Sequence, residues 1–308
     1  MKNAGQCDNL IVIVGPTAVG KTAVAIELAC KIGGEIISAD SMAVYVGMDV
    51  GTAKPTREEQ SRARFHLIDV VDPSEDFNVG EFQRLAHQAI DDVLERNPPA
   101  ILVGGSGLYV RAAVDGLDLD IPAGSEELRK DLRDQAHKYG NEYLHRRLRE
   151  LDPVSAAQIH PNNLKRVIRA IEICELSGSP ASELHDKTRS GYNCARFFGL
   201  TMNRQLLYER IEKRVDAMIA DGLIDEVSGL LNRGIEPQML SMQGVGYKEI
   251  AGFLRGEYTK QEAIQLLKRN TRRFAKRQYT WFMRDERIRW LEIDGMTAKK
   301  VSELIIKE

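Results

Sequence analysis

The sequence predicts an α/β protein with a parallel sheet, helices on the faces of the sheet, and an all-α insertion. Three observations support this fold class. Residues 10–14 (Leu-Ile-Val-Ile-Val) form a continuous apolar run that ends at Gly15-Pro16, as buried strands of parallel sheets do. Strand and helix patterns then alternate as far as residue 103. Residues 125–189 show helical periodicity and contain no strand candidate.

The alternating region is divided by clear stop signals. Gly33-Gly34 and Pro98-Pro99 each follow a segment with helical spacing of apolar residues, and Asp72-Pro73 follows an apolar run. Glycine ends helices in the left-handed conformation, and proline cannot continue them. Strands separated by helices pair in parallel, so we expect one parallel sheet. The helices predicted here cover residues 21–32 and 79–96, and the strands cover 35–39, 66–71 and 100–103.

The second half of the chain returns to the sheet after the insertion. Residues 197–201 (Phe-Phe-Gly-Leu-Thr) predict a strand, the following residues are mostly helical, and a late strand is predicted near 288–293. We therefore expect a catalytic core made of residues 1–118 and 196–308. Residues 119–195 would form a helical insertion domain.

Composition excludes several classes of protein. The chain has 308 residues, a net charge of −2, 43% hydrophobic and 29% charged residues, close to globular averages. It has no apolar run of 18 residues and no signal-peptide core. None of its four cysteines lies in a C-x-x-C pair, so neither a zinc knuckle nor a disulfide framework is indicated. We expect a cytoplasmic protein without a membrane span, and a monomer.

A glycine-rich motif links the first strand to the first helix. It fits G-x-x-x-x-G-K-[ST], whose backbone N–H groups and helix N-terminus bind phosphate. Lys21 would reach terminal phosphate oxygens, and Thr22 would place its hydroxyl on Mg²⁺. The fold class is therefore P-loop NTPase-like, and a di- or triphosphate ligand is expected; a plain glycine turn is the alternative. The motif consists of Gly15, Pro16, Thr17, Ala18, Val19, Gly20, Lys21 and Thr22.

An acidic residue stands at the end of the next predicted strand. The strand 35–39 runs into Asp40, whereas the strand 100–103 runs into Gly-Gly-Ser-Gly without an acid. Ligands of open α/β sheets bind at the carboxyl ends of the strands. Asp40 could therefore hold Mg²⁺ through water, or it could act as a general base.

Several longer phrases are distributed over the whole chain. They are the P-loop, Ser38-Ala-Asp-Ser-Met42 with Val44-Tyr45, Asp49-Val-Gly-Thr-Ala-Lys-Pro55, His66-Leu-Ile-Asp69, Gly104-Gly-Ser-Gly-Leu-Tyr109, Lys165-Arg-Val-Ile-Arg-Ala-Ile-Glu172, Gly244-Val-Gly-Tyr-Lys-Glu249 and residues 271–282. Together these phrases resemble one family, the tRNA dimethylallyltransferases. The resemblance implies transfer of a dimethylallyl group from dimethylallyl diphosphate to N6 of the adenosine 3′-adjacent to the tRNA anticodon. The chain departs from the family where Ala43 replaces the usual glutamine and Ser106 the usual threonine.

The resemblance implies roles for three residues at the reacting atoms. It makes Asp40 the base that orients the adenine amine and takes its proton. It places Arg214 on the diphosphate and Thr17 near the reacting oxygen. Simpler roles remain open: a Mg²⁺-water ligand or helix cap for Asp40, an i,i+4 helix pair with acids for Arg214, and a backbone turn for Thr17.

The resemblance also implies a tRNA-binding surface. Residues 265–289 hold nine Lys/Arg against two acids, and the predicted basic helix 268–289 interleaves them with aromatic residues, as RNA-binding surfaces do. A solvated helix with core aromatics is the alternative. The residues expected to contact the anticodon stem-loop are Asp40, Ser41, Met42, Ala43, Ser106, Arg129, Leu164, Lys165, Arg166, Val167, Ile168, Gln243, Gly244, Val245, Gly246, Tyr247, Lys248, Lys276, Arg277, Gln278, Tyr279, Thr280, Trp281, Phe282 and Met283.

Three other functions compete with this interpretation. A small-molecule or nucleotide kinase would use the same P-loop and turn over ATP, with no need for the basic helix. A second possibility is prenylation of free adenine nucleotide rather than tRNA, and a third is a non-catalytic RNA-binding NTPase. Incubation with dimethylallyl diphosphate and either tRNA or AMP separates them.

Overall fold

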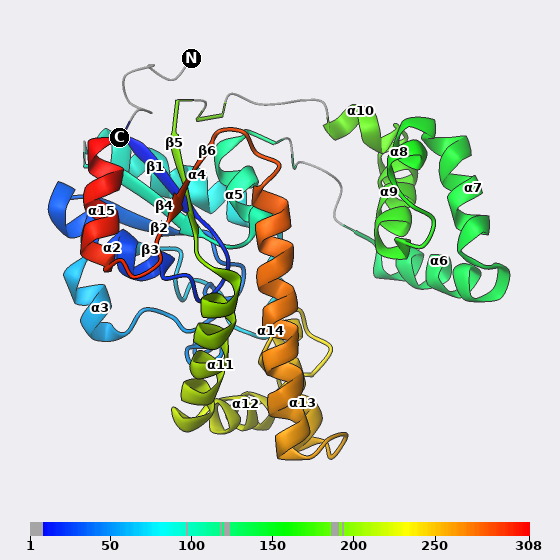
Figure 1. Cartoon of the computed structure of the whole chain (residues 1–308). Helices are drawn as coiled ribbons and strands as arrows, with labels where there is room; N and C mark the ends of the chain where they lie inside the picture. The colour runs from blue at the N-terminus through cyan, green and yellow to red at the C-terminus, as the bar shows by residue number, and fades with distance from the viewer. Residues whose placement is uncertain (1–8, 97, 118, 120–123, 186–190, 193) are drawn as a thin grey trace. The chain divides into compact units, whose positions relative to one another are not determined.

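A six-stranded sheet organises the larger of two compact units (Figure 1). The computed structural model describes residues 9–96, 98–117, 119, 124–185, 191–192 and 194–308. The strand order is β3-β2-β4-β1-β5-β6, and every neighbouring pair is parallel. The predicted α/β fold is therefore confirmed. The strands are β1 (Leu10–Val14), β2 (Glu35–Ser38), β3 (Phe65–His66), β4 (Ala100–Gly104), β5 (Arg196–Thr201) and β6 (Ile288–Glu292).

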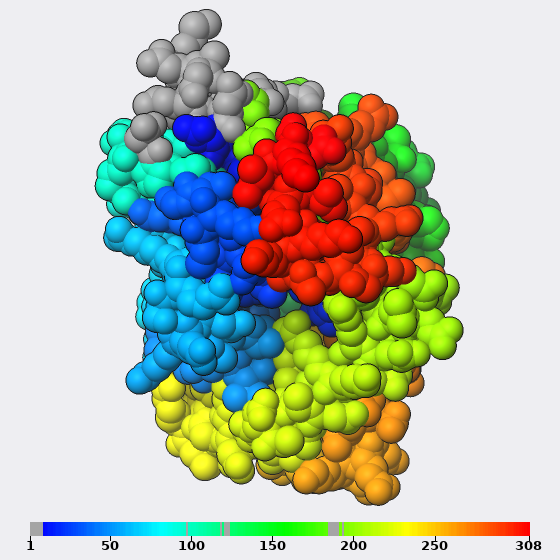
Figure 2. Space-filling model, turned by 60° about the vertical axis from the view of Figure 1, so that its left-hand side comes forward, coloured from blue at the N-terminus to red at the C-terminus, as the bar shows by residue number. Residues whose placement is uncertain are grey.

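Helices cover the sheet because their apolar stripes meet its buried residues. Ile11 and Ile13 of β1 pack with Val24 and Leu28 of the first helix in one continuous core. Figure 2 shows the C-terminal helix α15 in red beside the blue N-terminal segments, which agrees with its packing against α2. The helices of this region are α2 (Lys21–Ile32), α3 (Arg57–Arg62), α4 (Val79–Glu95), α5 (Gly107–Val114) and α15 (Ala298–Lys307).

A second group of helices extends from the carboxyl end of the sheet. Helices α11 and α14 run side by side, and α12 and α13 close the far end of the group (Figure 1). Thr259 and Glu262 form a capping box that starts α14, satisfying two backbone donors that a helix start leaves free. The elements are α11 (Arg204–Ala220), α12 (Leu223–Asn232), η1 (Ser241–Gln243), α13 (Tyr247–Leu254) and α14 (Lys260–Phe282).

The smaller unit spans residues 115–191 and has its own core. Leu132, Leu144, Leu148 and Ile171 are fully buried in it. The unit starts and ends four residues earlier than the predicted insertion 119–195. The residues that flank it on either side, Val114 and Tyr192, belong to the larger unit. They are joined by a hydrogen bond in which the Tyr192 N–H donates to the Val114 carbonyl at 2.8 Å. The described helices are α6 (Glu126–Tyr139), α7 (Asn141–Leu151), α8 (Pro153–Gln158), α9 (Leu164–Ser177) and α10 (Ala181–His185).

The third predicted strand is wrong in its extent. Only residues 65–66 pair with the sheet, because Leu67 and Asp69 adopt positive φ angles of 62° and 56°. The following residues pair instead with the loop after β2: the Val70 N–H donates to the Val44 carbonyl at 2.8 Å. The apolar run 66–71 therefore covers that loop rather than extending the sheet.

The basic helix is shorter than predicted. Helix α14 ends at Phe282 rather than continuing to residue 289. The Asp285 carboxylate accepts from the backbone N–H of Arg287 at 3.1 Å, a local turn that competes with helix. Residues 288–292 then form β6, close to the predicted late strand.

Two further expectations concern cysteines and membranes. Cys30 and Cys174 are free, whereas Cys194 is disulfide-bonded. The cysteine spacing, which indicates no disulfide framework, does not point to this bond. In the part of the chain that the structure describes, no helix is long and apolar enough to cross a membrane.

Candidate active site

The P-loop adopts the backbone that a phosphate cradle needs. It connects β1 to α2, and Gly15 and Gly20 have φ angles of 146° and 106°, which side chains rarely tolerate. A Cβ on Gly15 would lie 2.6 Å from the Leu200 carbonyl oxygen. The loop can therefore follow this path only with glycine at that position.

Lys21 lies in the first turn of α2 and points back over the loop. Its Nζ donates to the carbonyls of Gly15 and Pro16, both at 2.9 Å. Burial lowers the pKa of Lys21 to about 8, although the nearby Asp40 carboxylate acts in the opposite direction. A bound phosphate dianion would favour the charged form of Lys21, which burial alone disfavours.

Lys21 and Thr22 line a small cavity of about 90 Å³, which we call the inner cavity. Mg²⁺ is usually held by one or two protein oxygens together with waters and substrate phosphates. In the described residues, no group of three or more His, Cys, Asp or Glu could hold a metal ion. Thr22 contributes one hydroxyl oxygen to the lining of the inner cavity, which fits an ion that takes its other ligands from water and phosphate oxygens.

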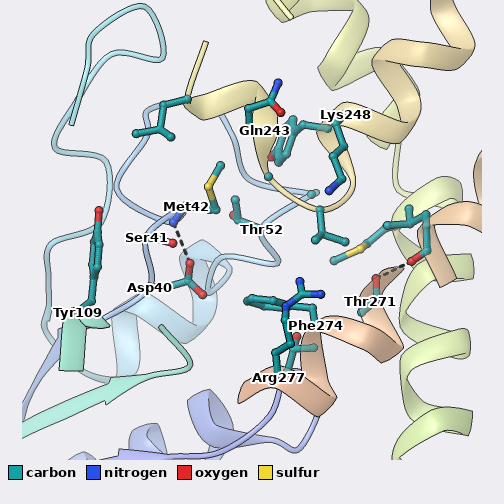
Figure 3. A pocket seen from close by; sticks show the side chains of 18 of the residues that line it. Asp40, Ser41, Met42, Thr52, Tyr109, Gln243, Lys248, Thr271, Phe274 and Arg277 are labelled. Atoms are coloured by element: carbon teal, nitrogen blue, oxygen red, sulfur yellow. Dashed lines mark hydrogen bonds between the residues drawn. The ribbon is translucent and has the colours of Figure 1, made fainter. Parts of the chain in front are cut away.

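Asp40 follows β2 at the carboxyl edge of the sheet, as predicted. Its Oδ1 accepts from the Met42 backbone N–H at 2.9 Å (Figure 3). The neighbouring Ser41 N–H donates to the Ser106 hydroxyl at 3.3 Å, so the loops after β2 and β4 are joined beside Asp40. The carboxylate is thus held in place by the backbone of its own turn.

The two arginines on α11 each donate to a backbone carbonyl, and the two carbonyls belong to different loops. Arg210 donates to the Val19 carbonyl of the P-loop, and Arg214 donates to the Thr52 carbonyl, both at 3.3 Å. Burial lowers the pKa of Arg214, and Asp40 counteracts part of that effect. Among the described residues, no ion pair joins Arg214 to an acid of its own helix, which is the simpler role left open for it.

A larger cavity of about 530 Å³, the outer cavity, adjoins the inner one. Figure 3 shows Asp40, Thr52 and Phe274 facing this space. The Tyr109 ring borders it as well and stacks on Phe82, with ring centroids 4.2 Å apart. Five residues line both cavities, and we call them the throat: Thr17, Asp40, Thr52, Arg214 and Phe274.

The throat brings together the three residues assigned to the reacting atoms. Thr17, Asp40 and Arg214 come from three separate segments, and all three lie between the phosphate cradle and the outer cavity. Sequence reasoning missed Thr52, Tyr109 and Phe274. Each lies inside a phrase that pointed to the family, but nothing in the phrases says which side chain faces a cavity.

Many of the expected tRNA contacts surround the outer cavity. Ser106 is bonded to Ser41, and the loop from η1 into α13 forms the opposite wall. Gly244 allows that loop a close approach, because a Cβ there would lie 2.7 Å from Met42 Cε. The expected residues that line this cavity are Asp40, Ser41, Met42, Gln243, Gly244, Val245, Tyr247, Lys248 and Arg277.

Several expected contacts are buried, including Tyr247, whose side chain also borders the outer cavity. Gln278 bridges two loops: its Oε1 accepts from the Thr17 N–H at 2.8 Å and its Nε2 donates to the Gly105 carbonyl at 3.0 Å. The Tyr247 hydroxyl donates to Glu226 at 2.7 Å. Their side chains, and that of Phe282, support the site from inside. Ala43 and Gly246 are also buried.

The remaining expected contacts divide between two units. On α14 and just after it, Lys276, Tyr279, Thr280, Trp281 and Met283 are exposed. In the helical unit Arg129 pairs with the buried Glu172 at 2.9 Å. Val167 and Ile168 lie in the core of that unit, while Leu164, Lys165 and Arg166 form the start of α9.

The fold and the site together define a P-loop α/β protein whose phosphate cradle opens, past a carboxylate, into a larger cavity. A family model described as IPP transferase matches residues 43–285. The chain therefore belongs to the IPP transferase family. The match begins after the P-loop, but similar proteins cover that segment as well.

Individual proteins of this kind are similar to the chain over nearly its full length. A tRNA dimethylallyltransferase of Desulforudis audaxviator is 53% identical over 92% of this chain and 92% of its own. One from Geobacter metallireducens is 50% identical over 93% of both. The crystal structure of a tRNA isopentenylpyrophosphate transferase from Bacillus halodurans has a TM-score of 0.71 at 45% identity, over 97% and 95% of the two chains. A eukaryotic dimethylallyltransferase acting on tRNA has a TM-score of 0.79 at 27% identity, over 97% and 79%.

Proposed function

We propose that this protein transfers a dimethylallyl group from dimethylallyl diphosphate to N6 of the adenosine 3′-adjacent to the anticodon in tRNA. The observation that carries the proposal is the throat, where Asp40 and Arg214 stand between a phosphate cradle and a cavity large enough for a base. A nucleotide kinase would not need a second cavity bordered by a basic helix.

The inner cavity would hold the diphosphate. The P-loop N–H groups and the Lys21 ammonium would bind its oxygens, with Arg214 approaching from the other side of the throat. Mg²⁺, when bound at Thr22, would neutralise further charge on the leaving group. Negative charge grows on the diphosphate as the C–O bond breaks, so fixed cations here favour the transition state over the ground state.

Asp40 would serve the incoming amine. The N6 lone pair of adenine is delocalised, so the amine needs orientation and removal of a proton as the new C–N bond forms. The electron pair of the broken C–O bond leaves with the diphosphate, and the N6 proton passes to the Asp40 carboxylate. One oxygen of Asp40 is held by the Met42 N–H, which leaves the second oxygen for the amine.

The adenosine must leave its stack to enter the outer cavity. Extrusion costs roughly a few kcal/mol, which contacts to the RNA backbone have to offset. Helix α14 presents Arg269, Arg273, Lys276 and Arg277 along one exposed side, and none of these four forms an ion pair with another residue that the structure describes. Lys268 and Arg272, by contrast, are paired to Asp216 and Glu212 of α11, each at 2.6 Å.

The cellular setting follows from the substrate. Because tRNA is modified where it is used, we place this activity in the cytoplasm. We propose that it acts as a monomer.

One experiment tests the proposed function against its alternatives. The protein is incubated with dimethylallyl diphosphate, Mg²⁺ and either unmodified tRNA or AMP, and the digested products are analysed by mass. We expect N6-dimethylallyl adenosine from tRNA only. Product from AMP alone would favour prenylation of a free nucleotide, and tRNA-independent ATP turnover without prenylation would favour a kinase or an NTPase.

A further inference from the structure

The loop from Met48 to Pro55 forms one wall of the throat. Thr52 lines both cavities, while Ala53, Lys54 and Pro55 line the inner one. The loop belongs to no helix or strand, and Ala53 adopts a positive φ of 47°. Such a segment holds a functional group in place only if surrounding contacts fix its backbone.

One side chain from another element supplies these contacts. Glu226, in the first turn of α12, accepts from three successive backbone N–H groups: Asp49 at 2.7 Å, Val50 at 2.8 Å and Gly51 at 3.1 Å. It also accepts from the Tyr247 hydroxyl at 2.7 Å. A Cβ on Gly51 would lie 2.6 Å from the Tyr247 ring, so loop and ring are in close contact around the carboxylate.

The chemistry of the four donors requires a carboxylate. An ionised carboxylate only accepts hydrogen bonds and has about four lone-pair sites, which suits four converging donors. Hydrogen bonds to an ionised acceptor are roughly twice as strong as those between neutral groups. An amide of the same shape would turn its NH₂ group toward donors that it cannot satisfy.

The clamped loop reaches the throat through its backbone. The Thr52 carbonyl accepts from the Arg214 guanidinium at 3.3 Å, so the position of the loop sets the position of Arg214. Tyr247 begins α13 and lines the outer cavity. Glu226 therefore joins two walls of the site, although it is not among the described residues that line either cavity.

We propose that Glu226 is a positioning residue for the transfer reaction, holding the loop 48–55 and thereby the Arg214 guanidinium at the throat. The proposal rests on the function proposed above. The residue does not touch the reacting groups; it acts through the backbone of the loop and the Thr52 carbonyl.

A double-mutant cycle tests this chain of contacts. Glu226→Gln, Arg214→Ala and the double variant are compared under single-turnover conditions, well below their melting temperatures. We expect Glu226→Gln to lower the rate constant by about 10- to 100-fold, since small misplacements of a reacting group cost up to this much. The KM for tRNA should change little. The double variant should be no slower than Arg214→Ala to within about twofold.

Two outcomes of the cycle would overturn the proposal. One is a Glu226→Gln rate constant equal to that of the wild type. The other is a double variant slowed by the product of the two single effects, which would show that Glu226 does not act through Arg214. A merely structural role would lower the melting temperature without changing the rate constant of the folded protein. If Glu226→Gln does not fold, the cycle is repeated with Glu226→Asp, which keeps the charge but shortens the reach.

A matched control and an independent measurement complete the test. Asp225 is an exposed acid next to Glu226 on α12, so Asp225→Asn should retain the wild-type rate. Binding of inorganic diphosphate should weaken in Glu226→Gln and stay unchanged in Asp225→Asn. A wild-type protein that does not prenylate tRNA would refute the proposed function, whereas unchanged diphosphate binding in Glu226→Gln would refute the positioning role alone.

Discussion

At the scale of single residues, the site depends on charged groups that the fold holds out of water. Lys21 and Arg214 both lie where burial lowers their pKa, and the Asp40 carboxylate offsets part of that effect for each. Two cations with one nearby anion leave positive charge at the throat. The negative charge of a diphosphate would therefore balance this excess positive charge.

The lowered pKa of Lys21 gives the first prediction. Below pH 8 the free ammonium is charged, and above pH 8 it loses its proton, whereas an ordinary lysine would keep it to about pH 10.5. We expect the affinity for dimethylallyl diphosphate to fall as pH rises from 8 to 10, by up to about tenfold per pH unit. Calorimetric titration over this range measures it. The Lys21→Met variant should bind weakly with a flat profile, and a flat wild-type profile would contradict the prediction.

The sequence predicts site residues correctly where a short segment contains all the residues that define the motif. The P-loop and Asp40 stand at strand ends, where the neighbouring residues alone define their surroundings. Thr52, Tyr109 and Glu226 could not be found in this way. Each becomes part of the site only because distant segments converge on it, and no spacing within one segment encodes that convergence.

At the scale of elements, helix α14 has two different sides. One side is buried: Ala275, Gln278 and Phe282 pack inward, and Gln278 reaches the P-loop. The other side exposes Arg269, Arg273 and Lys276. The two interpretations of its sequence, an RNA-binding helix and a solvated helix with core aromatics, thus describe different sides of the same helix.

The basic side gives a prediction about salt. We expect the Arg273→Glu/Arg277→Glu variant to flatten the dependence of log affinity for tRNA on log salt by roughly one to two units, because each phosphate contact contributes about −0.7 to −0.9. Lys299→Glu/Lys300→Glu on α15 makes the same change in charge elsewhere and should leave the slope unchanged. Binding is titrated at several salt concentrations, alongside melting temperatures. An unchanged slope in a stable Arg273/Arg277 variant would remove α14 from the RNA surface.

Element boundaries show what local patterns miss. The run 66–71 has strand-like composition, but Leu67 and Asp69 turn to positive φ and the run pairs with residues 43–46. Asp69 also accepts from Lys54 at 2.5 Å, a contact between distant segments that no pattern within the run indicates. Helix α14 likewise stops at Phe282, where a turn around Asp285 leads into β6.

At the scale of the whole molecule, the chain is a P-loop core interrupted by a helical unit. The core cluster of the sheet and that of the helical unit share no residue. The chain leaves the core at Val114 and returns at Tyr192, which is hydrogen-bonded to it. This arrangement lets each unit bury its own apolar surface, so the sheet does not depend on the insertion for its core.

That separation gives a prediction about the helical unit. Replacing residues 115–191 with a short glycine-serine linker should preserve the fold and the binding of dimethylallyl diphosphate. Affinity for tRNA should fall by at least about tenfold, because the basic residues Arg129, Lys165 and Arg166 are lost and each phosphate contact adds to affinity. Calorimetry and a filter-binding assay measure the two ligands separately. Unchanged tRNA affinity in the shortened protein would exclude this unit from the RNA site.

The most direct test of the whole account is the single-turnover rate of dimethylallyl transfer to tRNA by Asp40→Asn. The substitution keeps the size of the side chain and removes its ability to take a proton. We expect the rate constant to fall by about 10² to 10⁴-fold, the usual contribution of a general base, while tRNA and dimethylallyl diphosphate still bind. A variant that transfers the group at nearly the wild-type rate would contradict the role of Asp40 and the chemistry placed at the throat.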